Sequence, residues 1–448
     1  MILKIKNLGP LKKGEVNISK NILFFVGFNN SGKTYLTQLI WGIYNEAFYR
    51  EFIQGINVNK ISRVRNINNF KIEEKNIEIL LNEYKIYIKD NIHRIFKSEK
   101  KYFSKFEIDF AMTDDAKKLI ANGIDVKFTN TLDKDDVVNI TTKSNNKKLE
   151  INITKNTDLE NIKRRIIHFL LLGLFEGQSF YLPSIRGAYT TFYQYIYKIE
   201  KDKKDKIDDF MLSEEKNAKK LMEIVEQYKP SYTLAMNELI SKMISLKQEN
   251  ITNKEYIEFQ ERIEKLIGGT VNMTKSQVGQ KEIKLKIKNG HELPMYLVSS
   301  NSNQLTTLYL YFKYWIEKKD KNFLILDEPE ENLHPQNQYE IMNIMMDFVA
   351  KGNKLLLTTH SSLLAKIINN YITYSQLNEK NKERINNKYI NSNINKDDIE
   401  ICFFDGEQVK HYDIEEYGVV FKDFLAIENE IASLSNEINI KLYEQGND

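Results

Sequence analysis

The chain has 448 residues, of which 42% are hydrophobic and 28% charged, a composition typical of a globular protein. Its 65 basic and 62 acidic residues leave a net charge of +3, which argues neither for nor against a nucleic-acid partner. The single cysteine, Cys402, excludes a disulfide framework and a cysteine-based metal site.

The sequence also argues against membrane and secretory segments. No stretch approaches the roughly 20 apolar residues that a membrane-spanning helix needs. The N-terminus, MILKIKNLGPLKKGEV, begins with an alternating strand pattern and lacks the apolar block of a secretory signal. We therefore expect a cytoplasmic protein with no membrane partner.

The first 26 residues predict two short strands, ILKIKNL and NILFFV. The second is a continuous apolar run, typical of a strand that is buried on both faces of a parallel sheet. A glycine-rich turn follows at residues 27–32, and TYLTQLIWGIYNEAFY then places apolar side chains at helical spacing. This order of strand, loop and helix is the context that a phosphate-binding loop requires.

The loop itself, GFNNSGKT at residues 27–34, matches the pattern G-x-x-x-x-G-K-[S/T]. Its glycines would let backbone N–H groups face phosphate oxygens at the positive end of the following helix. We expect Lys33 to reach the β and γ phosphates of ATP and the Thr34 hydroxyl to bind Mg²⁺. The candidate ATP-binding residues of the loop are Gly27, Asn29, Asn30, Ser31, Gly32, Lys33 and Thr34.

The middle of the chain predicts insertions between the sheet strands. Residues 51–175 mix helical patterns with the strand-like pieces FEIDFAM and LEINITK, and SFYLP is a second buried strand. Long helical patterns rich in lysine and glutamate follow at 190–268, and Gly268 and Gly269 end the last helix. They predict an inserted helical lobe or short arm, at most two antiparallel helices of roughly 50 Å. A solvated lobe without a ligand is the alternative to a functional arm.

Two further buried strands carry polar residues at their carboxyl ends. A strand EIKLKIK and a helix at about 303–317 lead into FLILDEPEENLHP, where Asp327 can bind Mg²⁺ and Glu328 can polarise an attacking water. KLLLTTHS then places His360 where its imidazole can hydrogen-bond the γ phosphate or that water. Glu328 and His360 are the expected catalytic residues, and Thr34 and Asp327 the expected metal ligands.

Taken together, GFNNSGKT, LDEPEENLHP and TTHS resemble the P-loop, the Walker B segment with its D-loop, and the switch histidine of ABC-type ATPases. The form ENLHP is similar to that of RecF and OLD-family proteins, and FYLPSIRG resembles a segment of the same group. The chain as a whole therefore resembles the SMC, RecF and OLD side of the class. Among these, the chain most resembles ATPases of phage-defence operons, such as the PtuA subunit of Septu systems. The resemblance implies an α/β fold of the ABC type with a mostly parallel sheet, and an ATPase with ATP and Mg²⁺ as cofactors.

The resemblance also implies a division of the chain into four parts. These are the N-terminal part of an ATPase head at 1–190, a helical lobe or short arm at 191–280, the C-terminal part of the head at 281–380, and a tail at 381–448.

A homodimer or higher homo-oligomer with composite ATP sites is a further implication. In the family, a serine and a glycine of one subunit contact the γ phosphate that is bound to the other. Ser299, Ser300 and Asn301 occupy these positions, and asparagine in place of the usual glycine implies slow hydrolysis or mainly structural ATP binding. The D-loop residues Asn332 and His334 would lie near this contact. Arg186 is expected to face a phosphate or the partner subunit, and an ordinary surface arginine is the alternative.

The function that we expect follows from an ATP site that is joined to no second catalytic centre. The sequence after His360 lacks the acidic spacing of the Toprim nuclease domain that OLD nucleases carry there. We expect a sensor or scaffold subunit of an anti-phage defence complex that controls a separate effector protein, a nuclease. A RecF-like DNA repair or maintenance ATPase that clamps DNA is the alternative, and direct contact with DNA stays open. A transporter subunit is disfavoured by ENLHP and by the inserted lobe.

Overall fold

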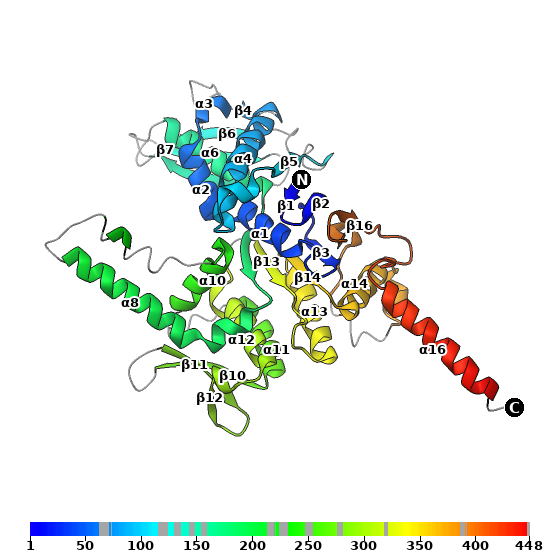
Figure 1. The fold of residues 1–448 in the computed structure, drawn as a ribbon. Coiled ribbons are helices and arrows are strands. Elements are labelled where there is room, and N and C mark those ends of the chain that lie inside the picture. The colour runs from blue at the N-terminus through cyan, green and yellow to red at the C-terminus, as the bar shows by residue number, and fades with distance from the viewer. Residues whose placement is uncertain are drawn as a thin grey trace.

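Six strands form the central sheet of the computed structural model, in the order β16–β15–β3–β14–β13–β9. Figure 1 labels β3, β14 and β13 in the middle of the molecule. Neighbouring strands run parallel from β15 to β9, and β16 pairs antiparallel with β15. Their bounds are β3 Ile22–Gly27, β9 Gln178–Leu182, β13 Asn322–Asp327, β14 Lys354–Thr359, β15 Ile399–Phe404 and β16 Val409–His411. The prediction of an α/β fold with a mostly parallel sheet is confirmed.

The structure describes residues 1–61, 71–72, 74–114, 124–129, 136–142, 148–153, 159–212, 219, 221–223, 232–246, 254–275, 281–317, 321–385, 390 and 392–445. Parts of the predicted insertion at 51–175, of the lobe at 191–280 and of the tail at 381–448 lie outside these ranges.

Strand β3 shows why its sequence is an uninterrupted apolar run. Leu23 and Phe25 pack into one hydrophobic core, and Phe24 and Val26 into a second core on the opposite face of the sheet. Every residue of β3 is buried. Because helices cover both faces, neither face of the strand meets water.

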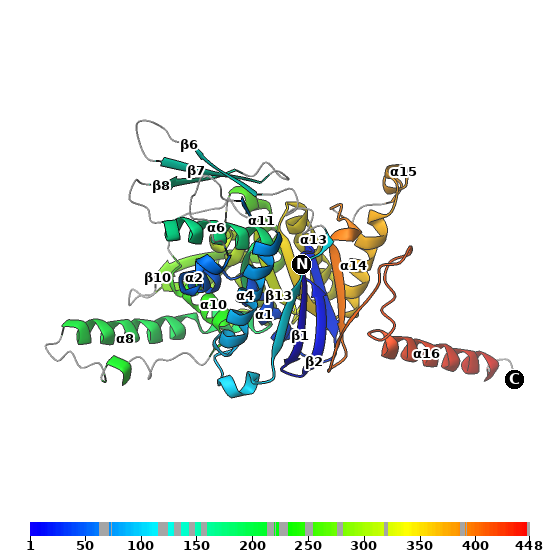
Figure 2. The ribbon, with the colours of Figure 1, turned by 90° about the horizontal axis from the view of Figure 1, so that it is seen from above.

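The first core lies between the central sheet and an N-terminal layer (Figure 2). This layer contains an antiparallel sheet of β1 Ile2–Leu8, β2 Leu11–Asn17 and β5 Glu107–Ala111. Its helices are α1 Lys33–Tyr44, α2 Glu46–Gly55, α3 Val58–Ile61, α4 Glu74–Ile95 and α6 Leu159–Leu174. Strands β1 and β5 were predicted. Strand β2 was not, because only Leu11 and Val16 of LKKGEVN are buried and the pattern is too polar.

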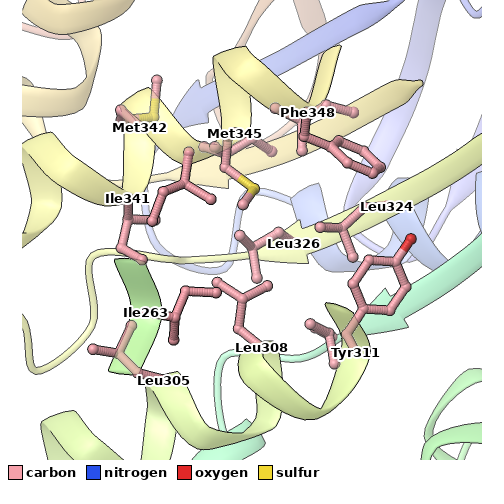
Figure 3. Close-up of a cluster of buried hydrophobic side chains, with 14 of the residues drawn as sticks. Ile263, Leu305, Leu308, Tyr311, Leu324, Leu326, Ile341, Met342, Met345 and Phe348 are labelled. Atoms are coloured by element: carbon pink, nitrogen blue, oxygen red, sulfur yellow. The ribbon is translucent and has the colours of Figure 1, made fainter. Parts of the chain in front are cut away.

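The second core lies under helices of the C-terminal half of the chain. These helices are α7 Arg186–Thr191, α10 Leu234–Ile244, α11 Ile257–Ile267, α12 Ser300–Leu310, α13 Pro335–Ala350 and α14 Ser362–Ser375. Figure 3 shows Leu324 and Leu326 of β13 between side chains of α12 and α13. The helix predicted at about 303–317 begins at Ser300 and changes to a π-helical turn at Tyr311–Trp315.

The predicted lobe is represented by α8 Tyr193–Leu212, which projects from the body (Figures 1 and 2). Its 20 residues span roughly 30 Å. The expected long antiparallel partner is not among the described helices, since α10 and α11 pack on the head and α11 ends at Gly268, as predicted.

The remaining elements are peripheral. One small sheet holds β10 Gly269–Lys275, β11 Lys281–Ile287 and β12 Glu292–Pro294, and another holds β4 Lys71–Ile72, β6 Ile124–Thr129, β7 Asp136–Thr142 and β8 Lys148–Ile153. Single helical turns are η2 Lys100–Phe103, η3 Lys254–Tyr256, η4 Met295–Leu297, α15 Glu379–Lys382 and η7 Lys396–Asp398.

The segment expected as a tail takes part in the central sheet. Strand β15 pairs with β3, next to the P-loop, and β16 extends the sheet beyond it. After β16, helix α16 Ala426–Gln445 projects away from the body (Figures 1 and 2). No helix in the described part of the chain combines the length and the apolar character needed to cross a bilayer.

Candidate functional site

The loop between β3 and α1 requires glycine at two positions. Gly27 has a φ of +150° and Gly32 a φ of +93°. A Cβ atom at Gly27 would lie 2.3 Å from the carbonyl oxygen of Phe404, and one at Gly32 would lie 2.6 Å from Cγ of Leu11. Asn30 also has a left-handed backbone, which asparagine tolerates. The loop is therefore fixed by its neighbours, while Asn29 and Asn30 stay exposed.

Lys33 lies inside this loop. Its ammonium donates to the carbonyl oxygens of Gly27 at 3.1 Å and Phe28 at 2.8 Å, and lies 3.4 Å from the hydroxyl of Ser31. Burial lowers the pKa of Lys33 to about 8, although nearby acidic side chains oppose this shift. The loop thus surrounds a buried ammonium group with acceptors that a phosphate could replace.

The two expected metal ligands, Thr34 and Asp327, lie side by side. The Thr34 hydroxyl lies 3.4 Å from Oδ2 of Asp327, which also accepts a hydrogen bond of 3.0 Å from Tyr181. Thr358 donates to the other carboxylate oxygen. Burial raises the pKa of Asp327, because a charged carboxylate is poorly solvated there. A divalent cation would stabilise the charge, and oxygen ligands are those that Mg²⁺ prefers, so these residues fit the expected ion.

The side chain of Glu328 pairs with His360. Its backbone has a φ of +46°, and its N–H group donates to both the carbonyl and the hydroxyl oxygen of Thr358 at 3.1 Å. Its carboxylate lies 3.4 Å from Nε2 of His360. This hydrogen bond lowers the pKa of Glu328, so the carboxylate is charged and able to accept a proton.

Two polar residues of the site were not singled out from the sequence. Glu330 accepts hydrogen bonds from the Thr359 hydroxyl at 2.6 Å and the His360 N–H group at 2.8 Å, and burial raises its pKa. Gln38, one turn after Thr34, is buried, and its amide oxygen has no partner in the described ranges. Nothing in EPEEN distinguishes Glu330 from its acidic neighbours, and Gln38 carries no motif.

A comparison with protein families matches residues 1–365, which contain this loop, both acids and the histidine, to the family described as the AAA ATPase domain. The chain belongs to the AAA ATPase domain family. No curated protein matches it.

Solved structures similar to this ATPase include three SMC heads. The head domain with an extended coiled coil bound to the C-terminal domain of ScpA, from Pyrococcus furiosus, is 13% identical and has a TM-score of 0.33, with 96% of this chain and 98% of that chain covered. The head bound to the C-terminal winged-helix domain of ScpA is 15% identical, with a TM-score of 0.35 and 93% and 98% covered. The head domain from Thermotoga maritima is 10% identical, with a TM-score of 0.31 and 92% and 98% covered.

Arg186 of the ATPase lies under the acidic turn that carries Glu328. The side chain is buried, and its guanidinium donates to the carbonyl oxygens of Asp327 at 2.9 Å and of Pro183 and Pro329 at 3.2 Å. Burial lowers its pKa to about 10. This differs from the surface arginine considered as the alternative. The expected contact with a phosphate or a partner stays a prediction, whereas the contacts with the turn are observed.

We expect Arg186→Lys to destabilise the protein by about 2–3 kcal/mol, because a lysine cannot supply the planar fork that satisfies several buried carbonyl groups. Urea unfolding of the purified ATPase measures this. Arg50→Lys is the matched control, since Arg50 is largely exposed and pairs with Glu46. Equal unfolding midpoints for the two variants would show that the guanidinium does not hold the turn.

The candidate signature and D-loop residues lie at two helix starts. Ser299 caps α12, its hydroxyl accepting from the Ser302 N–H group at 3.3 Å, and Ser300 beside it is exposed. The amide oxygen of Asn301 has no partner among the described residues. His334 caps α13 through Nδ1. Ser299 and His334 bond to N–H groups two or three residues away in their own helices. Within one chain, these capping side chains therefore show no described contact with Lys33.

The position of α12 is nevertheless tied to the acidic turn. The amide of Gln304 donates to the carbonyl oxygen of Ser184 at 2.8 Å and to Glu331 at 3.1 Å, and its oxygen accepts from the Gly187 N–H group. Asn332 follows in this turn with a left-handed φ of +59° and is exposed. Gln304 therefore connects α12, which carries the candidate signature residues, to the turn that carries the candidate D-loop residue Asn332.

A mixed group of metal-ligand types lies at the sheet edge. Atoms of Glu400, Cys402 and His411 lie within 4.8 Å of one another. His411 already pairs with Glu400 at 2.8 Å, and Cys402 is fully buried in the first core. The ion pair and the apolar packing account for this group.

Proposed function

We propose that this protein binds Mg·ATP at residues 27–34 and hydrolyses it to ADP and phosphate. The observation that carries the proposal is the convergence of five side chains at the carboxyl ends of the neighbouring strands β3, β13 and β14. They are Lys33, Thr34, Asp327, Glu328 and His360. In open α/β sheets, ligands bind at this edge.

The roles follow from the contacts described above. Lys33 exchanges loop carbonyl groups for phosphate oxygens, and Thr34 and Asp327 hold Mg²⁺, which neutralises phosphate charge when bound. Glu328 accepts a proton from the water that attacks the γ phosphorus while the bond to the ADP oxygen breaks. His360 holds the Glu328 carboxylate in place. Membership of the AAA ATPase domain family supports this chemistry.

A second protomer completes each site in this proposal. Ser299 and Ser300 are exposed at the start of α12, where backbone N–H groups and the helix dipole favour an anion. A head-to-tail pair would place them against the γ phosphate that is bound to the partner, near Asn332 and His334. The side chain of Asn301 restricts the approach of that phosphate, so we expect slow turnover.

Mixing two inactive variants tests the composite site. Lys33→Ala disables the P-loop, and Ser300→Arg disables the segment that faces the partner. In a mixed dimer, one site carries both defects and the other carries neither. Statistical pairing should therefore restore about a quarter of the parental ATPase activity. If mixtures are as inactive as their components, each site is made from one chain.

In the cell, we propose a sensor or scaffold subunit of an anti-phage defence complex that acts through a separate nuclease. The resemblance of the chain to ATPases of phage-defence operons supports this role. A second support is that the sequence after the ATP-site motifs lacks the acidic spacing of a Toprim nuclease domain, so the nuclease is expected in a separate protein.

Co-expression with the neighbouring genes, purification, and mass measurement of the complex test this role. A stable complex with a nuclease would support it, together with phage resistance that Lys33→Ala removes. Nucleotide-dependent binding of DNA without a nuclease partner would instead favour a RecF-like clamp.

A further inference from the structure

Tyr181 of β9 contacts the expected metal ligand Asp327 from the neighbouring strand. In the parallel pairing of β9 with β13, Tyr181 lies opposite Ile325, two residues before Asp327. Paired residues, and residues two positions apart on one strand, lie on the same face of a sheet. The Tyr181 hydroxyl donates to Oδ2 of Asp327 at 3.0 Å. It thus holds the carboxylate oxygen that also lies 3.4 Å from the Thr34 hydroxyl.

The Asp327 carboxylate is held at both of its oxygens. Thr358, which lies opposite Asp327 on β14, donates its hydroxyl to Oδ1, and Tyr181 donates to Oδ2. Neither donor is an expected metal ligand, so both bonds can remain when a cation binds. Outer partners of this kind orient the ligands of metal sites and strengthen metal binding.

Gln38 directs the proton of the Tyr181 hydroxyl. Its amide group donates to the Tyr181 hydroxyl, and both side chains are buried. Gln38 lies four residues after Thr34, on the same side of helix α1. A phenol has one proton, so a hydroxyl that accepts from Gln38 is free to donate that proton to Asp327. The amide oxygen of Gln38 has no partner among the described residues, which leaves the contact with Tyr181 to order the amide.

The hydroxyl of Tyr181 serves the carboxylate rather than the core. The ring packs in the first core with Phe323 and Ile325, where a phenylalanine would fill the same space. A buried hydroxyl needs hydrogen-bond partners to offset the loss of water, and Asp327 and Gln38 are the partners here. The side chain therefore combines an apolar ring for packing with a polar group that faces the metal pair.

We propose that Tyr181, ordered by Gln38, is a positioning residue that orients Asp327 toward the divalent cation of the ATP site. This inference rests on the proposed function, because it requires Mg²⁺ beside Thr34 and Asp327. Tyr181 acts through Asp327 and touches neither the metal nor the nucleotide in this role. Outer partners of metal ligands typically contribute roughly 10–100-fold to metal affinity, and we expect about 10-fold from this single hydroxyl.

Binding of adenylyl imidodiphosphate, an ATP analogue that is not hydrolysed, tests the proposal without turnover. Titration calorimetry of the full chain in EDTA and in Mg²⁺ gives two affinities, and their ratio measures the gain from the metal. We expect Tyr181→Phe to reduce this ratio by about 10-fold and to leave the affinity in EDTA unchanged. An unchanged ratio would overturn the proposal.

Tyr84→Phe is the matched control. Tyr84 is also fully buried, and its hydroxyl donates to the carbonyl oxygen of Ile43 at 2.9 Å, so the variant loses one buried hydrogen bond as well. Urea unfolding should show similar losses of stability in Tyr84→Phe and Tyr181→Phe. The gain from Mg²⁺ should be parental in Tyr84→Phe. An equal reduction of this gain in both variants would mean that Tyr181 acts only through stability, which would contradict the proposal.

Gln38→Leu tests whether Gln38 acts through Tyr181, and it keeps the Tyr181 ring in the core. Alone, it should reduce the gain from Mg²⁺ by a smaller factor than Tyr181→Phe, since the hydroxyl can still reach Asp327. Added to Tyr181→Phe, it should have no further effect, because its partner is already lost. Additive effects in the double variant would contradict the assigned role of Gln38.

The parent protein separates this proposal from the proposed function. A parent that does not bind the analogue, or binds it no better in Mg²⁺ than in EDTA, would overturn the Mg·ATP site and the role of Tyr181 with it. A parent with a clear gain from Mg²⁺ that Tyr181→Phe retains would overturn only the role of Tyr181.

Discussion

Lys33→Ala is expected to abolish detectable binding of Mg·ATP and any protective activity in cells. The ammonium supplies the strongest phosphate contact of the loop, and charge-assisted hydrogen bonds are about twice as strong as neutral ones. We expect affinity to fall by about 10²-fold or more, which corresponds to about 3 kcal/mol. Titration calorimetry measures this, with Lys101→Ala as a control at an exposed lysine. Parental affinity in Lys33→Ala would show that residues 27–34 are not the ATP site.

The pH dependence of binding gives a second readout for Lys33. Burial lowers its pKa to about 8, so the free protein loses this positive charge as the pH rises through about 8. Phosphate favours the charged form, so affinity should decline above that pH, and binding there should take up a proton. The Lys101→Ala variant should show the same decline. An affinity independent of pH up to about 9.5 would mean that Lys33 is not titrating in this range.

Glu328→Gln is expected to reduce ATP hydrolysis by about 10²-fold or more while ATP binding is kept. The amide has nearly the size of the carboxylate but cannot accept a proton from water. The metal pair of Thr34 and Asp327 is unchanged, so the variant should trap ATP. Single-turnover phosphate release measures the chemical step.

The matched control is Glu331→Gln, because Glu331 contacts Gln304 rather than His360 and should have a much smaller effect. Unchanged turnover in Glu328→Gln would assign the base to His360 or to a residue of a second subunit.

The sequence predicted those strands whose own residues form a clear apolar pattern. NILFFV, SFYLP, FLILD and KLLLTTH were recognised because strands buried on both faces are uninterrupted apolar runs. Strand β2 was missed because most of its side chains face water. Strand β15 was missed because its ICFF core follows a polar stretch, and its partner β3 lies far away in sequence.

In the candidate site, too, residues that a local motif places were predicted, whereas residues placed by contacts far away in sequence were not. Gly27, Gly32, Lys33 and Thr34 follow from one motif, because a single loop and helix place them. Asp327 and Glu328 were assigned their expected roles from their place at the end of a buried strand. Glu330 was missed, because its hydrogen bonds with Thr359 and the His360 N–H group depend on a strand about 30 positions away. The burial of Arg186 could not be predicted, because it depends on carbonyl groups about 140 positions away.

The P-loop contacts β15, a strand that is synthesised after all the motif residues of the ATP site. We therefore expect the ATP site to form late during synthesis. Phe28 donates its N–H group to the carbonyl oxygen of Phe404 at 3.2 Å, and Gly27 packs against the same residue. A nascent chain that has left the ribosome only as far as His360 carries every motif residue but lacks the strand beside the loop. We therefore expect the loop to reach its final conformation only once this distant segment is available, because contacts between segments far apart in sequence form late. The nascent ATPase should therefore acquire its nucleotide only after Phe404 has emerged from the ribosome.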